Sequence, residues 1–207
     1  MQRQTYIERL RREVFGDYIP DDTSLTIGLV NSFLNDAIGI AVKTNYKDSI
    51  QLDGVSYVNN SFYTTFKNIT VAKDEDFLYK ITLPELPIAV GRNEGVASLQ
   101  FRSTDNKISQ NAIPISIAQK NYYIGLRRIP NKILYYTEGK FAYAISTIIL
   151  TSYTANVGMI SGGDSTQLDS ELNVPADYFP VMEAYLMPIL MRERTVVKDS
   201  TNDATDN

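Results

Sequence analysis

The N-terminal part of the chain has the hydrophobic spacing of two amphipathic helices. Within residues 5–15 the apolar positions recur every three to four residues, at Ile7, Leu10 and Val14. Residues 16–20 interrupt the pattern, and residues 21–24 (Asp-Asp-Thr-Ser) offer side-chain oxygens and negative charge that suit a new helix N-terminus. Apolar positions then recur from Leu25 to about Tyr46. We therefore expect a pair of helices joined by a short turn.

The centre of the chain is rich in β-branched and aromatic residues, which favour strands. We expect strands at residues 62–71, 77–83, 96–102, 113–118, 132–137 and 140–150. Glu138-Gly139 predicts a hairpin between the last two, because glycine adopts positive φ without steric cost. Residues 83–87 (Leu-Pro-Glu-Leu-Pro) predict an extended connection, since neither proline has an amide donor for a sheet.

The C-terminal part predicts a loop, a helix and a polar tail. Residues 161–165 (Ser-Gly-Gly-Asp-Ser) have the composition of a flexible loop. Beyond them, one face of a helix would carry Tyr178, Met182, Tyr185, Leu186 and Ile189. Pro180 fits a first helical turn, whereas Pro188 predicts a kink or a split. The polar residues at the C-terminus are expected to be mobile.

These elements predict an α+β fold, in which an N-terminal helix pair and a C-terminal helical segment pack with a central antiparallel β domain. The expected divisions are a helical module at residues 1–47, a β-rich domain at 48–160, a loop with the C-terminal helical segment at 161–195, and a mobile polar tail at 196–207.

Composition removes several function classes. The 207 residues include no histidine, cysteine or tryptophan, so Ser-His-Asp and Cys-His catalysis, His- or Cys-ligated zinc and disulfides are excluded. Twenty-four acidic and 20 basic residues give a formal charge of −4, which argues against a dedicated nucleic-acid binder. Asp74-Glu75-Asp76 matches no calcium loop and predicts a solvated turn. We expect no catalytic residue, cofactor or metal site, and therefore no enzyme.

Two other classes stay open at this point. A glycoside hydrolase needs only two converging carboxylates and no histidine, so a tail-associated glycan hydrolase is one alternative. A monomeric binding module with a tyrosine-rich face is the other, since the chain has 14 tyrosines. Basic residues lie in the first helix (Arg3, Arg9, Arg11, Arg12) and at Arg127-Arg128. They could contact phosphate, but the net negative charge favours a solvated face or salt bridges to a neighbouring subunit.

Export and membrane signals are not evident. The first 15 residues contain four arginines and no continuous apolar run, which is unlike a signal peptide. The longest apolar stretch, residues 141–150, is far shorter than a membrane span of about 20 residues. We therefore expect no membrane partner.

Four stretches carry a resemblance to a known family. They are residues 3–12 (RQTYIERLRR) with the helix start at 21–24, residues 83–88 (LPELPI) before 92–96 (RNEGV), the helix entry at 173–177 (NVPAD), and the Asp-rich tail. Together they resemble the head–tail connector, or ring/adaptor, proteins of crAss-like and related tailed bacteriophages of Bacteroidetes.

The resemblance implies a virion structural protein, assembled in the host cytoplasm, that forms a ring beneath the portal and encloses the DNA channel. It implies about 12 copies, because the portal is a dodecamer. The implied partners are further copies of the chain, the portal protein, other neck and tail proteins, and genomic DNA passing without specific contact.

A ring requires two unlike surfaces on each subunit. We expect the helical face formed by Tyr178, Met182, Tyr185, Leu186 and Ile189 to dock on a neighbouring copy or on the portal. Arg9 and Arg12 are further candidates for this interface. The alternative for the C-terminal face is packing inside the chain against the helix at 25–42, and both can hold for different residues.

Overall fold

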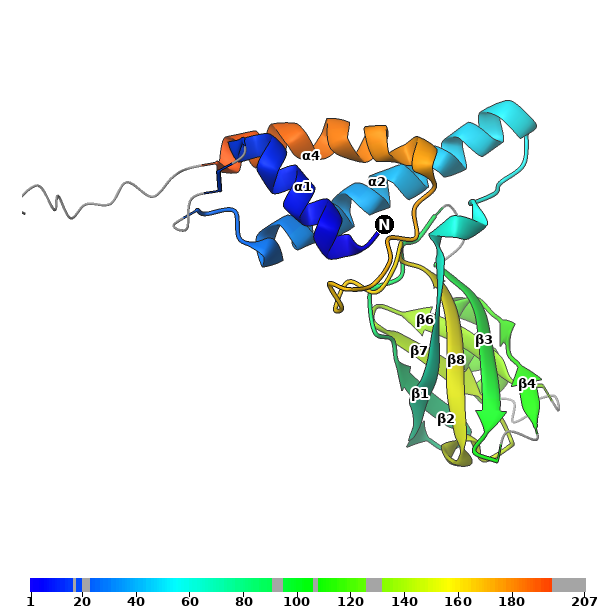
Figure 1. Ribbon diagram of the computed structural model, residues 1–207. Coiled ribbons are helices and arrows are strands. Elements are labelled where there is room, and N and C mark those ends of the chain that lie inside the picture. Colours follow the sequence, from blue (N-terminus) through cyan, green and yellow to red (C-terminus); the bar gives the residue numbers. More distant parts are fainter. Residues whose placement is uncertain (17, 20–22, 91–94, 106–107, 126–131, 195–207) are drawn as a thin grey trace, which may run out of the picture.

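The chain folds into a helical bundle and a β-barrel that meet at an angle (Figure 1). The computed structural model describes all residues except 17, 20–22, 91–94, 106–107, 126–131 and 195–207. The expected tail at 196–207 and the Arg127-Arg128 pair lie outside the described residues. The expected α+β fold, with helices before and after a mostly antiparallel sheet, is confirmed.

Three helices form the bundle: α1 (Arg3–Phe15), α2 (Ile27–Asp53) and α4 (Phe179–Glu193). Helix α2 begins after Thr26, whose side chain accepts a hydrogen bond from the amide of Leu29. It ends at Gly54, which adopts the left-handed conformation of a C-terminal cap. Helix α2 therefore extends seven residues past the expected end at Tyr46. Its last turns project beyond the other two helices (Figure 1).

Helix α4 passes through Pro188 without interruption. Proline removes the amide that would bond to the carbonyl of Ala184, four residues earlier. Both residues lie on the exposed side of the helix, where water can bond to that carbonyl. The split that was one of the two expectations for Pro188 is therefore wrong, whereas Pro180 lies in the first turn as expected.

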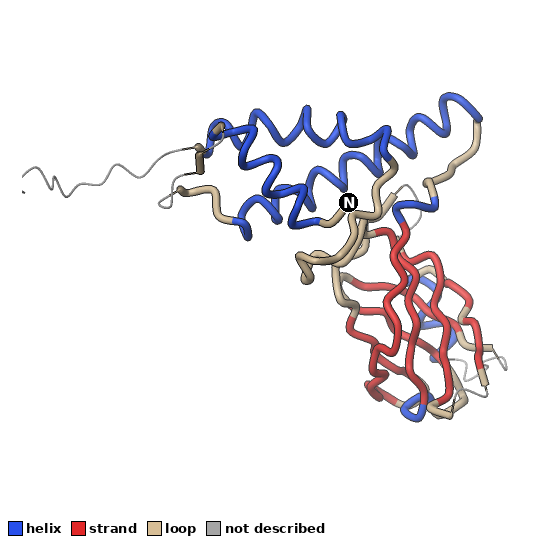
Figure 2. The backbone as a smooth tube through the Cα atoms, in the orientation of Figure 1, coloured by secondary structure: helices blue, strands red, loops and turns tan. Residues whose placement is uncertain are grey.

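In the part of the chain that the structure describes, eight strands form a nearly closed barrel (Figure 2), and their order is β4-β3-β8-β1-β2-β7-β6-β5. The strands are β1 (Tyr63–Glu75), β2 (Leu78–Thr82), β3 (Val96–Ser103), β4 (Ser109–Asn111), β5 (Ile113–Pro114), β6 (Leu134–Glu138), β7 (Phe141–Ile145) and β8 (Tyr153–Ile160). All pairs are antiparallel except β5 with β6. A short helix, α3 (Lys120–Gly125), lies in the same domain.

The chain itself joins the two edges of the sheet. Only Ala112 separates β4 from β5, and its amide donates to the carbonyl of Leu99 while the amide of Ile113 donates to that of Ile133. Strand β1 has a bulge where Asn68 has a φ of 60°, and it pairs with β8 on both sides of that bulge; only its last part, from Val71 to Glu75, pairs with β2. These two features allow the sheet to close.

The strand expectations needed three corrections. The expected strand at 140–150 ends at Ile145, because the amide of Ser146 donates to the carbonyl of Phe77 and the chain then crosses the end of the barrel. Strands β4 and β8 were missed. The expected strand at 113–118 is only two residues long. The hairpin at Glu138-Gly139 is confirmed, with Gly139 at a φ of 57°.

The two modules have separate hydrophobic cores. The bundle core is centred on α2 and includes Leu10, Leu34, Ile38, Met182 and Leu186. The barrel core is filled by inward-facing side chains, including Ile81, Leu99, Phe101, Tyr135 and Val157. A third small cluster lies outside β6 and β7, under the segment that includes α3. Each module therefore has its own apolar interior.

Candidate functional site

The junction between bundle and barrel is held by the N-terminus of the chain. The amide of Arg3 donates to the carbonyl of Ser170, and the amide of Leu172 donates to that of Met1. Gln2 forms an isolated antiparallel bridge with Glu171. Because Ser170 to Leu172 connect β8 to α4, the N-terminus ties this connection in place.

The segment at 161–165 is part of this junction. The loop expected at 161–165 is confirmed, and within it Ser161, Gly162 and Gly163 are buried. The Thr64 hydroxyl of β1 accepts hydrogen bonds from the Gly163 amide and from the Asn173 side chain. Two glycines are needed because the backbone here has positive φ and lies close to its neighbours.

Arg3 is completely buried beside this segment. Its Nη1 donates to Asn31 Oδ1 at 2.8 Å and to Asn35 Oδ1 at 2.7 Å, which links α1 to α2. Its Nε and Nη2 have no hydrogen-bond partner among the described residues. Burial lowers the pKa of the Arg3 guanidinium, and the charges of Glu85 and Asp164 oppose that shift. Arg3 is thus a structural cation inside the junction.

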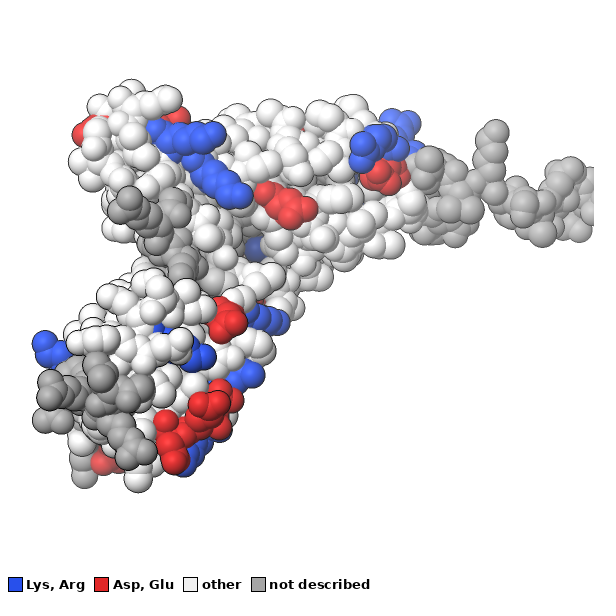
Figure 3. Space-filling model, turned by 180° about the vertical axis from the view of Figure 1, so that it is seen from behind, with Lys and Arg blue, Asp and Glu red and all other residues white. Residues whose placement is uncertain are grey.

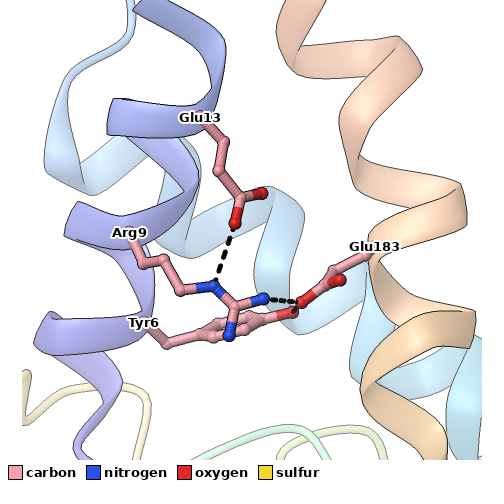
Figure 4. A network of polar contacts seen from close by, with 4 residues as sticks. All are labelled: Tyr6, Arg9, Glu13 and Glu183. Atoms are coloured by element: carbon pink, nitrogen blue, oxygen red, sulfur yellow. Dashed lines mark hydrogen bonds and ion pairs between the residues drawn. The ribbon is translucent and has the colours of Figure 1, made fainter. Parts of the chain in front are cut away.

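Arg9, an expected interface residue, lies in a polar network between α1 and α4 (Figure 4). Its Nε donates to Glu13 at 3.1 Å, and its Nη2 donates to Glu183 of α4. Its guanidinium also lies 5.3 Å from the centre of the Tyr6 ring. Arg9 therefore links two helices of its own bundle. Arg12, the other expected basic residue, is exposed on α1.

The expected C-terminal docking face divides into buried and accessible parts. Met182 and Leu186 are fully buried in the bundle core, where α4 packs against α2. For these two residues the alternative of packing inside the chain is therefore correct. The Tyr178 hydroxyl accepts from Asn45 at 3.0 Å and donates to Asp48 at 3.1 Å. Tyr185 and Ile189 are partly exposed. Tyr178 is partly exposed as well, so three of the five side chains keep accessible area.

A cleft of about 790 Å³ lies between α2 and the proline-containing connection. Its lining is mixed in charge and includes Asp36, Lys43, Glu85, Lys140 and Thr166. Glu85 accepts a hydrogen bond from the amide of Ser165, so one of its oxygens is already used to hold the junction. Asp36 and Glu85 both line the cleft, but Glu85 also helps to hold the junction through this hydrogen bond.

The projecting end of α2 exposes apolar side chains. In residues 50–57, which we call the overhang, every residue is exposed. Its apolar members are Ile50, Leu52, Val55 and Tyr57, and the side chain of Leu52 is 83% exposed. A cluster of exposed apolar groups on one short segment is typical of an interaction surface.

A second apolar group lies at the end of the barrel. The turns there carry Phe77 between β1 and β2, Ile108 before β4, and Ile149 in the connection from β7 to β8. All three are exposed, Ile149 to 69%. Phe77 has a φ of 66°, a conformation that costs energy for a bulky residue and that clusters at functional surfaces. We call this end the barrel tip.

Acidic residues flank the barrel tip. Asp74, Glu75 and Asp76 are exposed on the β1–β2 hairpin, as the expectation of a solvated turn requires. Asp76 pairs with Lys73 at 2.8 Å, which lowers the pKa of the Asp76 carboxyl through a hydrogen bond and charge attraction. Within the described ranges, no group of three or more carboxylates is arranged to hold a metal ion.

Tyrosine burial predicts a loss of stability at high pH. Burial, with a contribution from Glu183, raises the pKa of Tyr6 well above its usual value of about 10. Above pH 10 the unfolded chain therefore loses its Tyr6 proton while the folded chain keeps it, so the free energy of unfolding falls as pH rises.

We expect urea midpoints to decline from about pH 10 upward, and Tyr6→Phe to reduce that slope. Absorbance of tyrosinate near 295 nm, followed during unfolding, measures the ionisation. A folded protein in which Tyr6 ionises near pH 10 would contradict this expectation.

No known protein family or curated protein is similar enough to this chain to indicate its function, so the surfaces described above carry the evidence. None of the helices in the described part of the chain combines the length and apolar character needed to cross a bilayer. A scan of protein-family models finds no match to the chain, and a search of curated proteins finds no significant match.

Proposed function

We propose that this chain is a structural subunit of a ring in the neck of a tailed bacteriophage, where it joins the portal to the tail around the DNA channel. One observation supports it above the others: a single body carries two unlike exposed apolar ends, the overhang and the barrel tip. A closed ring is built from such unlike, complementary surfaces.

The junction supports the same proposal. A subunit that transmits contacts between two neighbours needs its modules held in a fixed relation. Here backbone hydrogen bonds from the N-terminus, and a hydrogen bond from the Asn31 side chain of α2 to the carbonyl of Ser165, connect the bundle to the segment that leaves the barrel. The family resemblance adds the portal as the partner and about 12 as the number of copies.

Co-sedimentation with purified portal rings tests the proposal. The chain alone and the chain with portal rings from the same phage are centrifuged through a density gradient. We expect the chain to move into the fast fraction only with the portal, in a ratio near one copy per portal subunit. A chain that stays in the slow fraction at every concentration would contradict the proposal.

The hydrolase alternative rests on Asp36 and Glu85, which line one cleft. It predicts glycan cleavage that is lost in both Asp36→Asn and Glu85→Gln, because a glycosidase needs both carboxylates. The connector proposal predicts no turnover and unchanged portal binding in Asp36→Asn. The binding-module alternative predicts a monomer even in the presence of portal rings.

A further inference from the structure

The overhang is a helix end without support from its own chain. Helices gain most of their stability in proteins by packing an apolar face. Beyond Ser49 the residues of α2 are all exposed, and Ile50 and Leu52 face solvent with no helix beside them (Figure 1). The next apolar residues, Val55 and Tyr57, are also exposed. A partner that covers this segment would remove apolar area from water and hold the helix end.

The barrel tip carries acidic residues, whereas α2 carries two lysines close to the overhang. Lys43 and Lys47 are exposed on α2 within two turns of the overhang, whereas Asp74 and Glu75 flank Phe77 at the tip. Figure 3 shows basic side chains on the bundle close to the end of α2, with acidic ones at that end, and it shows acidic side chains low on the barrel with basic ones beside them. The overhang also contains Asp53, so the attraction comes from the lysine side of the helix. Complementary charges select a partner and orient it.

The overhang lies at the end of α2 from which the chain leads down into the barrel, and the barrel tip lies at the opposite end of the barrel (Figure 1). One chain cannot bring them together, because the bundle and barrel are tied at the junction by hydrogen bonds from Arg3 and Leu172. Contact between them therefore requires two molecules. Since the surfaces differ, such a contact is heterologous and repeats from copy to copy, which closes a ring when the rotation allows.

We propose that the overhang of one copy docks on the barrel tip of the next copy of this chain. On the face of α2 that carries Lys43 and Lys47, Ile50 would cover Phe77 and Ile149, and the two lysines would face Asp74 and Glu75. This inference rests on the proposed function, which supplies the assembly, and adds the surfaces through which neighbours bind.

Cysteine cross-linking in the portal-bound assembly tests the contact directly, because the chain has no cysteine of its own. Ser56→Cys places a thiol in the overhang, and Thr147→Cys places one at the barrel tip; both positions are exposed. We expect the double variant, oxidised on portal rings, to form a ladder of covalent oligomers. The control Ser56→Cys/Thr70→Cys moves the second thiol to an exposed position on the side of β1. We expect it to form at least tenfold less of the covalent oligomers.

Charge reversal gives a second, independent test. Lys43→Glu/Lys47→Glu and Asp74→Lys/Glu75→Lys should each weaken self-association on the portal at least tenfold, and mixing the two variants should restore it to within about threefold of the original. The control Lys67→Glu/Arg192→Glu changes exposed charges elsewhere and should have no effect.

The outcomes separate this inference from the proposed function. Rings that form on the portal without the cross-linked ladder, or with equal ladders from both cysteine pairs, overturn the proposed contact and leave the function standing. Absence of any assembly with the portal overturns both.

Discussion

Replacing Gly163 with alanine should lower the free energy of unfolding by about 4 kcal/mol, which combines backbone strain with a forced shift of packed atoms. Gly163 has a φ of 115°, and a β-carbon there would lie 2.5 Å from the carbonyl oxygen of Glu171. That carbonyl belongs to the connection held by the N-terminus, so it cannot move without disturbing the junction.

Gly54→Ala is the matched control. Gly54 also has positive φ, at 67°, but nothing lies within 4 Å of the position of its β-carbon. We expect a loss of only about 1 kcal/mol, the cost of the left-handed backbone alone. Urea unfolding followed by circular dichroism measures both. Equal losses in the two variants would mean that the junction tolerates the shift and that the segment at 161–165 is looser than its contacts indicate.

Replacing Leu186 with alanine should lower the free energy of unfolding by about 3 kcal/mol, through lost burial and the cavity that remains. Leu186 is fully buried between α4 and α2. Met191→Ala, five residues further along the same helix, should change stability by less than about 0.5 kcal/mol because Met191 is 57% exposed. The same unfolding experiment measures both variants.

The contrast also separates folding from docking. If Leu186→Ala left stability unchanged but reduced portal binding, the side chain would be serving an interface rather than the core. That result would contradict the packing described for α4.

Hydrophobic spacing predicted the helices well because they bury one face against a single neighbour. Leu10, Ile38 and Leu186 belong to the helical pattern and are buried as that pattern requires. The spacing could not show that α2 continues to Asp53, since the overhang has no buried face to create a pattern. Its apolar residues, above all Leu52, are exposed, so the spacing of apolar residues does not indicate burial in this segment.

The strands were harder to place because their partners are distant in sequence. Strand β8 pairs with β1 and β3, and its sequence, YTANVGMI, contains Asn156 and Gly158 at positions where a strand pattern weakens. A β-carbon at Gly158 would lie 2.5 Å from the Ser98 hydroxyl of the neighbouring strand β3, so that hydroxyl would have to rotate away. Such a close approach between strands is set by the closed barrel and leaves no local signal.

The candidate site was predicted only in part. Arg9 and Arg12 are both exposed, and Arg9 also pairs with Glu13 and Glu183 on the surface of its own bundle. Arg3 lies in the same basic sequence but is buried, because the N-terminus folds under α2 to hold the connection to α4. Nothing in a run of arginines distinguishes the buried one. The barrel tip was missed because Phe77, Ile108 and Ile149 come together only at the ends of strands.

Electron microscopy of the chain bound to portal rings tests the central claim that this protein acts as a repeated structural subunit. We predict a closed ring of about 12 copies coaxial with the portal, each copy contacting its neighbours on two sides. A portal that carries no added density, or a single copy bound at one place, would contradict the account.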